Sequence, residues 1–247
     1  MSQPIVAVSL KMYFERARTV EYCRSLASLV RERRGLGDVR MAVLPDFLAL
    51  HEAGQELDGS PVMLGAQDIC QADRGAYTGE VSGADLADLG VRVVEVGHAE
   101  RRALYHEDDR LVADKAAAAR RHGMIPLVCV GPSHRAEPRG MARTCADQVR
   151  SAVGDAGSEE VWVAYEPRWA IGASEPAHPE DISEVCHAMR EELRDLPGLS
   201  VLYGGSAGPG LLSRLDACVD GLFLGRFAHE PAAFLDVVQE AAERTAR

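Results

Sequence analysis

The chain has 247 residues, of which 47% are hydrophobic, enough for one large core and the usual length of a complete eight-stranded α/β barrel. Its 38 acidic residues outnumber the 27 basic ones and give a net charge of -11, which argues against nucleic acid or an anionic membrane surface as a partner. The six cysteines show no C-x-x-C pair or disulfide-like spacing, and no segment approaches a membrane-spanning length. We therefore expect a cytoplasmic protein without a metal site.

Short apolar runs rich in β-branched residues alternate with longer amphipathic stretches, the pattern of βα units that form a parallel sheet. Eight runs are predicted strands: Ile5–Ser9, Arg40–Leu44, Val62–Ala66, Val91–Val96, Ile125–Val130, Val161–Tyr165, Leu199–Tyr203 and Gly221–Leu224. The clearest predicted helices are Ala17–Arg34, Asp108–His122, Gly140–Val153, Pro179–Asp195 and Pro231–Thr245. In the third and seventh connections, which are short, the helical pattern is weaker.

Eight βα units also fit an open doubly wound sheet. That fold commonly carries a G-x-G-x-x-G or P-loop motif in the first connection, and neither motif is present here. The sequence therefore favours an α/β fold with a single closed (β/α)8 barrel, spanning residues 1–247 as one domain.

Charged or titratable residues follow three of the predicted strands directly. Lys11 follows the first strand, His98 and Glu100 follow the fourth, and Glu166 follows the sixth. A single such residue is more often a helix cap or a solvated loop residue. Because the active site of a barrel is built at the carboxyl ends of its strands, three of them together indicate a catalytic site.

These residues belong to a set of segments that resembles the triosephosphate isomerase family from the first strand to the last helix. The segments are Lys11-Met12, Gly65-Ala66-Gln67-Asp68, Gly75-Ala76-Tyr77-Thr78-Gly79-Glu80, Gly97-His98-Ala99-Glu100-Arg101-Arg102, Ala164-Tyr165-Glu166-Pro167-Arg168-Trp169-Ala170-Ile171-Gly172, Tyr203-Gly204-Gly205-Ser206 and Asp220-Gly221-Leu222-Phe223-Leu224-Gly225. The resemblance implies a TIM barrel that moves a proton between adjacent carbons of a small phosphorylated sugar. It implies no cofactor.

The resemblance also implies a role for each titratable residue. Glu166 is the expected base and His98 the expected neutral electrophile, while Lys11 would offset the charge of the enediolate and the phosphate. Glu100 would either assist proton movement or only orient Lys11. The plain alternatives are a salt-bridge partner for Glu166, a buried structural histidine for His98 and a solvated lysine for Lys11.

Glycine-rich turns are expected to hold the phosphate through backbone N–H groups. The predicted binding residues are Gly172 in a lid formed by Trp169–Ala177, the turn of Gly204, Gly205 and Ser206, and Gly225 after the last strand. Alternatively, these glycines only form ordinary tight turns and bind no phosphate.

Two departures from the family pattern bear on the substrate. Ser9 stands where the family usually has asparagine, and Arg226 follows Gly225 where a second glycine is usual. Both resemble a branch of the family that isomerises erythrulose phosphates in erythritol catabolism. The triose phosphates of glycolysis and gluconeogenesis are the first expected substrates, because they are the commoner ones in the family. L-erythrulose 1-phosphate with D-erythrulose 4-phosphate is the alternative pair.

Other classes of function were weighed against an isomerase. The G-x-S-x-G pattern around Ser206 suggests a serine hydrolase, but little chain follows it and His229 is the sole downstream histidine. His98-Ala99-Glu100 matches the H-x-E of zinc deaminases, but no P-C-x-x-C follows. A barrel that only binds a sugar phosphate is a further alternative.

The segment from Gly75 to Glu80 resembles a family loop that inserts into a neighbouring subunit. The resemblance implies a homodimer in which Thr78 contacts the active-site lysine or histidine of the other subunit. A surface turn is the simpler interpretation.

Overall fold

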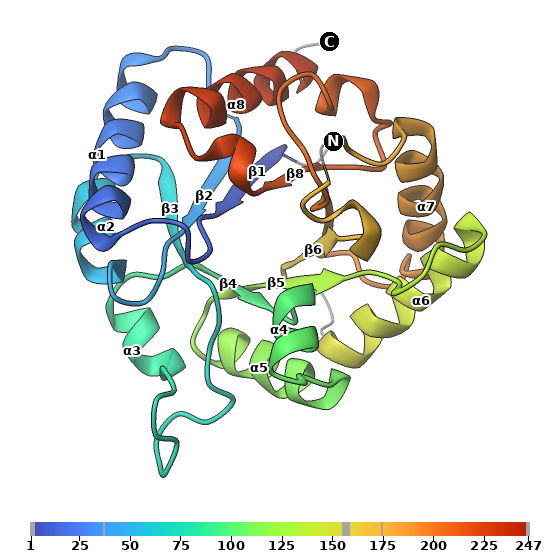
Figure 1. Cartoon of the computed structure of the whole chain (residues 1–247), viewed down its shortest axis with the longest axis horizontal. Helices are drawn as coiled ribbons and strands as arrows, with labels where there is room; N and C mark the ends of the chain where they lie inside the picture. Colours follow the sequence, from blue (N-terminus) through green and yellow to red (C-terminus); the bar gives the residue numbers. More distant parts are fainter. Residues whose placement is uncertain (1–2, 37, 155–158, 174, 246–247) are drawn as a thin grey trace.

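The structure is a computed structural model that describes residues 3–36, 38–154, 159–173 and 175–245 (Figure 1). Eight parallel strands form a closed barrel in chain order, and β8 pairs with β1 to complete it. The strands are β1 (Ile5–Ser9), β2 (Arg40–Leu44), β3 (Val62–Ala66), β4 (Val93–Val96), β5 (Ile125–Val130), β6 (Val161–Tyr165), β7 (Leu199–Tyr203) and β8 (Gly221–Leu224). The predicted (β/α)8 barrel is confirmed.

Seven of the predicted strands have the observed bounds, and the fourth starts two residues later than predicted. Val91 does not belong to β4, because its N–H donates to the carbonyl of Leu86 at 3.0 Å and so closes the turn after a short helix. Apolar character alone could not separate this turn residue from the strand that follows it.

The helices surround the barrel as an outer layer (Figure 1). They are α1 (Arg16–Glu32), α2 (Leu50–Leu57), α3 (Gly83–Asp88), α4 (Ala99–Leu104), α5 (Asp109–Arg121), α6 (Pro138–Val153), α7 (Pro179–Glu192) and α8 (Pro231–Thr245). The third connection holds only the six residues of α3, and the seventh holds the 3-10 turn Leu212–Arg214, as their weak helical pattern predicted. Helix α6 begins two residues before the predicted start because Pro138 fits the first helical turn. None of the described helices is long and apolar enough to cross a bilayer.

The interior of the barrel is packed with inward-facing side chains that alternate along each strand. Ile5 and Ala7 of β1 and Trp162 and Ala164 of β6 belong to this inner core. At the carboxyl end of the barrel the alternation continues into polar residues, namely Ser9, Glu95 and Glu166, all buried. The same register that fills the core therefore aims polar groups at the mouth of the barrel.

A buried ion cluster fixes the loop that follows β4. Nζ of Lys115 in α5 lies 2.7 Å from a carboxylate oxygen of Asp68 and 2.5 Å from one of Glu107, and all three side chains are almost fully buried. Arg101 of α4 contacts the same two carboxylates at 2.7 Å each. Because buried charges are stable only when they are paired, this cluster holds α4 against α5 and thereby fixes the segment that starts with His98.

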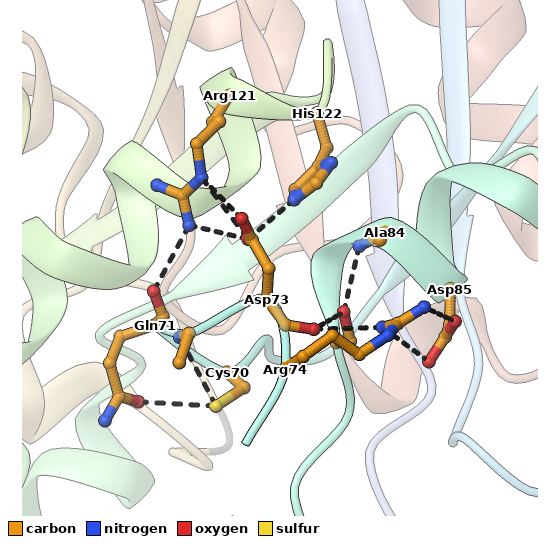
Figure 2. Close-up of polar contacts among 10 residues, drawn as sticks. Cys70, Gln71, Asp73, Arg74, Ala84, Asp85, Arg121 and His122 are labelled. Atoms are coloured by element: carbon orange, nitrogen blue, oxygen red, sulfur yellow. Dashed lines mark hydrogen bonds and ion pairs between the residues drawn. The ribbon is translucent and has the colours of Figure 1, made fainter.

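The connection between β3 and α3 projects beyond the barrel (Figure 1), and polar contacts pin its base (Figure 2). The N–H of Cys70 donates to the carbonyl of Val81 at 2.8 Å and closes the neck of the loop. Asp73 accepts from Arg121 and from His122 at 2.7 Å each, at the end of α5. Arg74 pairs with Asp85 of α3 at 2.7 Å, so the projecting loop is attached to two helices, while Thr78 within it is exposed.

Candidate active site

A cavity of about 630 Å³ opens at the carboxyl end of the barrel. Every pocket residue predicted from the sequence lines it: Ser9, Lys11, His98, Glu100, Glu166, Gly172, Gly204, Gly205, Ser206, Gly225 and Arg226. They come from the connections after β1, β4, β6, β7 and β8. The structure therefore brings the predicted catalytic and phosphate-binding residues into one site. Thr78 does not line this cavity.

Glu166 lies directly after β6 and is 3% exposed. Its N–H donates to the carbonyl of Val130 at 2.7 Å, so the backbone is held by the neighbouring strand. A Cβ at position 204 would lie 2.8 Å from Cγ of Glu166, so glycine is needed there to leave room for the carboxylate. Within the described part of the chain, Oε2 of Glu166 is buried without a hydrogen-bond partner.

The environment of Glu166 favours its protonated form more than water would. Burial, and then repulsion from Glu95, raise the pKa of Glu166 to about 8. The attraction of Lys11 opposes this shift only in part. A carboxylate with such a pKa binds a proton much more strongly than an exposed glutamate, which suits a base that takes a proton from carbon.

His98 is the N-cap of α4, and its ring is fixed by the backbone of that helix. The N–H of Glu100 donates to Nδ1 of His98 at 3.1 Å, so Nδ1 is an acceptor and the ring proton is on Nε2. Nε2 lies 3.6 Å from Oε2 of Glu166. Burial, and then the positive charge of Lys11, lower the pKa of His98 to about 4. A neutral imidazole therefore presents an N–H beside the buried carboxylate.

Lys11 lies in the turn that follows β1 and has a left-handed backbone conformation with φ of 50°, which is unfavourable for a residue with a Cβ. The side chain of Gln67 donates to the carbonyls of Lys11 and Leu44, at 3.1 and 2.9 Å, and holds this conformation. Nζ of Lys11 contacts Oε1 of Glu100 at 2.7 Å. Burial lowers the pKa of Lys11, but Glu100 and the carboxylates of Glu166 and Glu95 outweigh it, so the pKa lies above its ordinary value.

The loops after β6, β7 and β8 contact one another through the predicted lid. The hydroxyl of Ser206 donates to the carbonyl of Ala173 at 2.7 Å, and the guanidinium of Arg226 donates to that of Gly172 at 3.3 Å. Farther along, the N–H of Ala177 donates to the hydroxyl of Tyr203 at 3.1 Å. Of the lid predicted over residues 169–177, residue 174 lies outside the described residues.

The structure also shows a buried carboxylate that the sequence interpretation did not include. Glu95 lies within β4, is 3% exposed, and accepts a hydrogen bond from the hydroxyl of Ser9 at 3.0 Å. A signal was present, because a single glutamate interrupts the run Val93-Val94-Glu95-Val96 of an otherwise apolar strand. The pattern of titratable residues that follow strands does not include Glu95, because it lies within its strand.

The geometry does not form the sites of the other enzyme classes. Ser206 donates its hydroxyl proton to a backbone carbonyl in the lid and not to a histidine. Downstream of it, His229 packs its ring against those of Tyr13 and Phe14, at centroid distances of 5.3 and 4.7 Å. Among the described residues no group of three or more His, Cys, Asp or Glu side chains is arranged to hold a metal ion.

Comparisons with known proteins agree on one family. The family model described as triosephosphate isomerase matches residues 4–241. The chain is 45% identical over 245 residues to L-erythrulose-1-phosphate isomerase from Pectobacterium atrosepticum, covering 96% of this chain and 95% of that protein. It is 39% identical over 237 residues to triosephosphate isomerase from Mycobacterium sp. (strain JLS), covering 90% of each chain. The crystal structure of triosephosphate isomerase from Bartonella henselae superposes with a TM-score of 0.83 at 26% identity, covering 98% of this chain and 99% of that one.

The state of His98 can be measured directly. Since the pKa of this ring is lowered to about 4, the folded protein should keep His98 neutral at pH 7 and protonate it only well below pH 6, with the proton on Nε2. Nitrogen-15 NMR of histidine-labelled protein between pH 5 and 8 should show a neutral Nε2–H tautomer throughout, assigned by comparison with a His98→Gln variant. A ring that becomes cationic near pH 6.5 would contradict this geometry.

Proposed function

The chain belongs to the triosephosphate isomerase family, and we propose that this sugar-phosphate isomerase acts on the four-carbon pair L-erythrulose 1-phosphate and D-erythrulose 4-phosphate. The observation that carries the catalytic part is the buried carboxylate of Glu166, whose unpartnered oxygen lies 3.6 Å from the neutral Nε2–H of His98. A base and a hydrogen-bond donor at this separation suit proton transfer next to a carbonyl.

In this mechanism Glu166 removes the proton from the carbon beside the ketone. The electron pair of that C–H bond forms the carbon–carbon double bond, and the carbonyl oxygen becomes an enediolate oxygen that accepts a hydrogen bond from Nε2 of His98. Lys11 stabilises the negative charge. After a proton has moved between the two oxygens, Glu166 returns its proton to the neighbouring carbon, so the ketone has moved by one position and no other reactant is needed.

Glu100 serves in this proposal as the residue that positions Lys11. Their 2.7 Å contact keeps the ammonium group beside the cavity, while the backbone N–H of Glu100 fixes the ring of His98. One residue therefore places both the cation and the electrophile. This supports the simpler of the two roles that the family resemblance implies for Glu100.

In this proposal the phosphate binds against the turns that follow β6, β7 and β8, at Gly172, at Gly204 to Ser206 and at Gly225. Arg226 lines this side and adds a cation that would attract a phosphate dianion in a protein of net charge -11. Its contact with the carbonyl of Gly172 also connects the phosphate side to the lid. A lid that closes over the substrate would exclude water from the enediolate.

Two observations support the tetrulose pair over the triose pair and so reverse the order that the sequence suggested. The relative named as an L-erythrulose-1-phosphate isomerase shares 45% of its residues with this chain, against 39% for the triosephosphate isomerase from Mycobacterium. Ser9 lines the cavity, and a serine leaves more room than the usual asparagine. A tetrulose phosphate carries one more hydroxymethyl group than a triose phosphate and would use that room.

The six cysteines, all free thiols, fit the cytoplasmic location expected from the sequence.

Steady-state kinetics test the substrate. We expect kcat/KM for L-erythrulose 1-phosphate to exceed that for dihydroxyacetone phosphate and D-glyceraldehyde 3-phosphate by at least about 10-fold, since pockets discriminate one carbon group by roughly 1–3 kcal/mol. Each substrate would be assayed with the same enzyme preparation. A larger kcat/KM for the triose phosphates would return the triose pair to first place.

The Glu166→Gln variant tests the mechanism. The amide fills the same space but cannot take a proton, so kcat should fall by at least about 100-fold, the lower limit for loss of a general base. Affinity for inorganic phosphate, measured by calorimetry, should be unchanged because the phosphate loops are intact. Glu180→Gln is the matched control, since the Glu180 side chain is 89% exposed on α7. Turnover that survives Glu166→Gln would remove Glu166 from the role of base.

A homodimer is also proposed, on the evidence of exposed apolar side chains at one side of the barrel mouth. They follow four adjacent strands, β1 to β4. The exposed residues are Met12 at 92%, Leu48 at 83%, Leu104 at 69%, Tyr105 at 65% and Tyr77 at 44%. An apolar area of this kind marks an interaction site, and the loop with Thr78 projects beside it with its base already fixed by Asp73.

The Thr78→Arg variant tests the dimer. An arginine at the tip of the projecting loop should prevent docking, so light scattering after size exclusion should show the mass halved, with kcat/KM reduced at least about 10-fold through displacement of catalytic groups. Thr144→Arg, an equal change on the exposed face of α6, should alter neither property. A fully active monomer, of either the wild type or the variant, would contradict the proposed role of this loop.

A further inference from the structure

Glu95 is a buried charge that the mechanism does not use. It lies on the inner side of β4, between valines, and is 3% exposed. Among the described residues no lysine or arginine comes within ion-pair distance of its carboxylate. A buried carboxylate without a cationic partner is costly, and a barrel interior is normally filled by apolar side chains. The position therefore calls for an explanation beyond packing.

The contacts of Glu95 all point toward the floor of the active-site cavity. One carboxylate oxygen accepts from the hydroxyl of Ser9 at 3.0 Å. The other oxygen lies 3.9 Å from both Nε2 of His98 and the thiol of Cys129. Glu95 does not line the cavity itself, so it touches the site through Ser9 and His98.

The hydrogen bond to Glu95 sets the polarity of Ser9. An ionised carboxylate oxygen only accepts hydrogen bonds, so the single hydroxyl proton of Ser9 is donated to Glu95. Toward a ligand in the cavity, the hydroxyl oxygen of Ser9 can then act only as a hydrogen-bond acceptor. The floor of the site thus presents a hydrogen-bond acceptor of fixed direction, which suits a ligand hydroxyl and not a hydrogen atom bound to carbon.

This acceptor lies at the end of β1, beside β8, and it is held close to His98, because the other oxygen of the Glu95 carboxylate that binds it lies 3.9 Å from Nε2 of that ring. With the phosphate at the turns after β6, β7 and β8, and the reacting carbons at Glu166 and His98, we assign the carbon beyond the reacting pair to the part of the cavity that Ser9 lines. In a tetrulose phosphate that carbon is a hydroxymethyl group. In a triose phosphate the chain ends at the reacting carbons.

We propose that Glu95 is a specificity-determining positioning residue, which holds the hydroxyl of Ser9 as the acceptor for the terminal hydroxymethyl group of the tetrulose phosphate. The inference rests on the proposed substrate. It differs from the catalytic proposal, because Glu95 acts through Ser9 and contacts no reacting atom.

Removing the charge of Glu95 should also be visible at Glu166, because repulsion from Glu95 is the second cause, after burial, of the raised pKa of Glu166. Burial raises the pKa of Glu95 itself to about 7. The titratable and charged groups that act on this pair are Lys11, Asp68, His98, Glu100 and Cys129. With Glu95 neutral, the pKa of Glu166 should fall, and the acid limb of the pH profile of kcat/KM should move to lower pH.

The test compares wild type, Glu95→Gln and Ser9→Ala on L-erythrulose 1-phosphate and on dihydroxyacetone phosphate. The amide of Glu95→Gln has nearly the shape of the carboxylate but adds a donor and removes the charge. We expect kcat/KM for the tetrulose phosphate, divided by kcat/KM for the triose phosphate, to fall about 10- to 100-fold in either variant, the range for loss of one specific contact. The double variant should be no worse than the single ones, because the two residues act as a unit.

The pH profile supplies a readout that a purely structural role would not move. Glu95→Gln should shift the acid limb to lower pH, and Ser9→Ala, which leaves the charge in place, should not. Equal losses on both substrates, or no loss on the tetrulose phosphate, would overturn the role of Glu95 while leaving the proposed function intact. Failure of the proposed function would appear separately, as a wild-type enzyme that prefers the triose. If Glu95→Gln does not fold, Ser9→Ala alone decides, through the same ratio of the two substrates.

Discussion

The proposed mechanism depends on one desolvated contact, that of the Glu166 carboxylate with the His98 imidazole. Both groups are almost fully buried, and burial favours the uncharged form of each, so the pKa of Glu166 rises to about 8 while that of His98 falls to about 4. The two shifts have opposite signs and one cause. The ionised form of Glu166 is therefore a stronger base than a glutamate in water, and it lies beside a neutral N–H donor, whereas a histidine in water is partly cationic at neutral pH.

The scaffold maintains this contact through backbone and buried polar interactions that lie outside the cavity. The ring of His98 is held by the N–H of Glu100, and the helix that begins there is fixed by the cluster of Arg101 with Asp68, Glu107 and Lys115. Since each member of that cluster is charged and three are almost fully buried, displacing α4 would separate charges in a region of low dielectric constant. The helix that begins at His98 is therefore held in place by charged residues that do not line the cavity.

Most of the fold could be predicted from the sequence because a parallel barrel buries both faces of every strand, and continuous apolar runs such as Val161–Tyr165 are easily recognised. The pocket residues that follow strands could be predicted for the same reason, since the end of a run marks the mouth of the barrel. Glu95 could not be placed in this way, because it lies within a strand and only the inward register shows that its side chain reaches Ser9. The predicted start of β4 at Val91 was wrong, because the N–H of Val91 donates to the carbonyl of Leu86 and Val91 therefore belongs to the turn before the strand.

The inward-facing register of the strands also separates the residues proposed for the reaction from those proposed to select the substrate. In the proposed mechanism, Glu166 and His98 act on any sugar phosphate whose carbonyl lies next to a C–H group. Ser9 and Glu95 lie at the carboxyl ends of β1 and β4, where a hydrogen bond joins their buried side chains. A change there alters the length and polarity of that part of the cavity without moving the reacting atoms. Substrate length could therefore vary within this fold at the cost of one buried carboxylate, whose pKa is raised by burial to about 7.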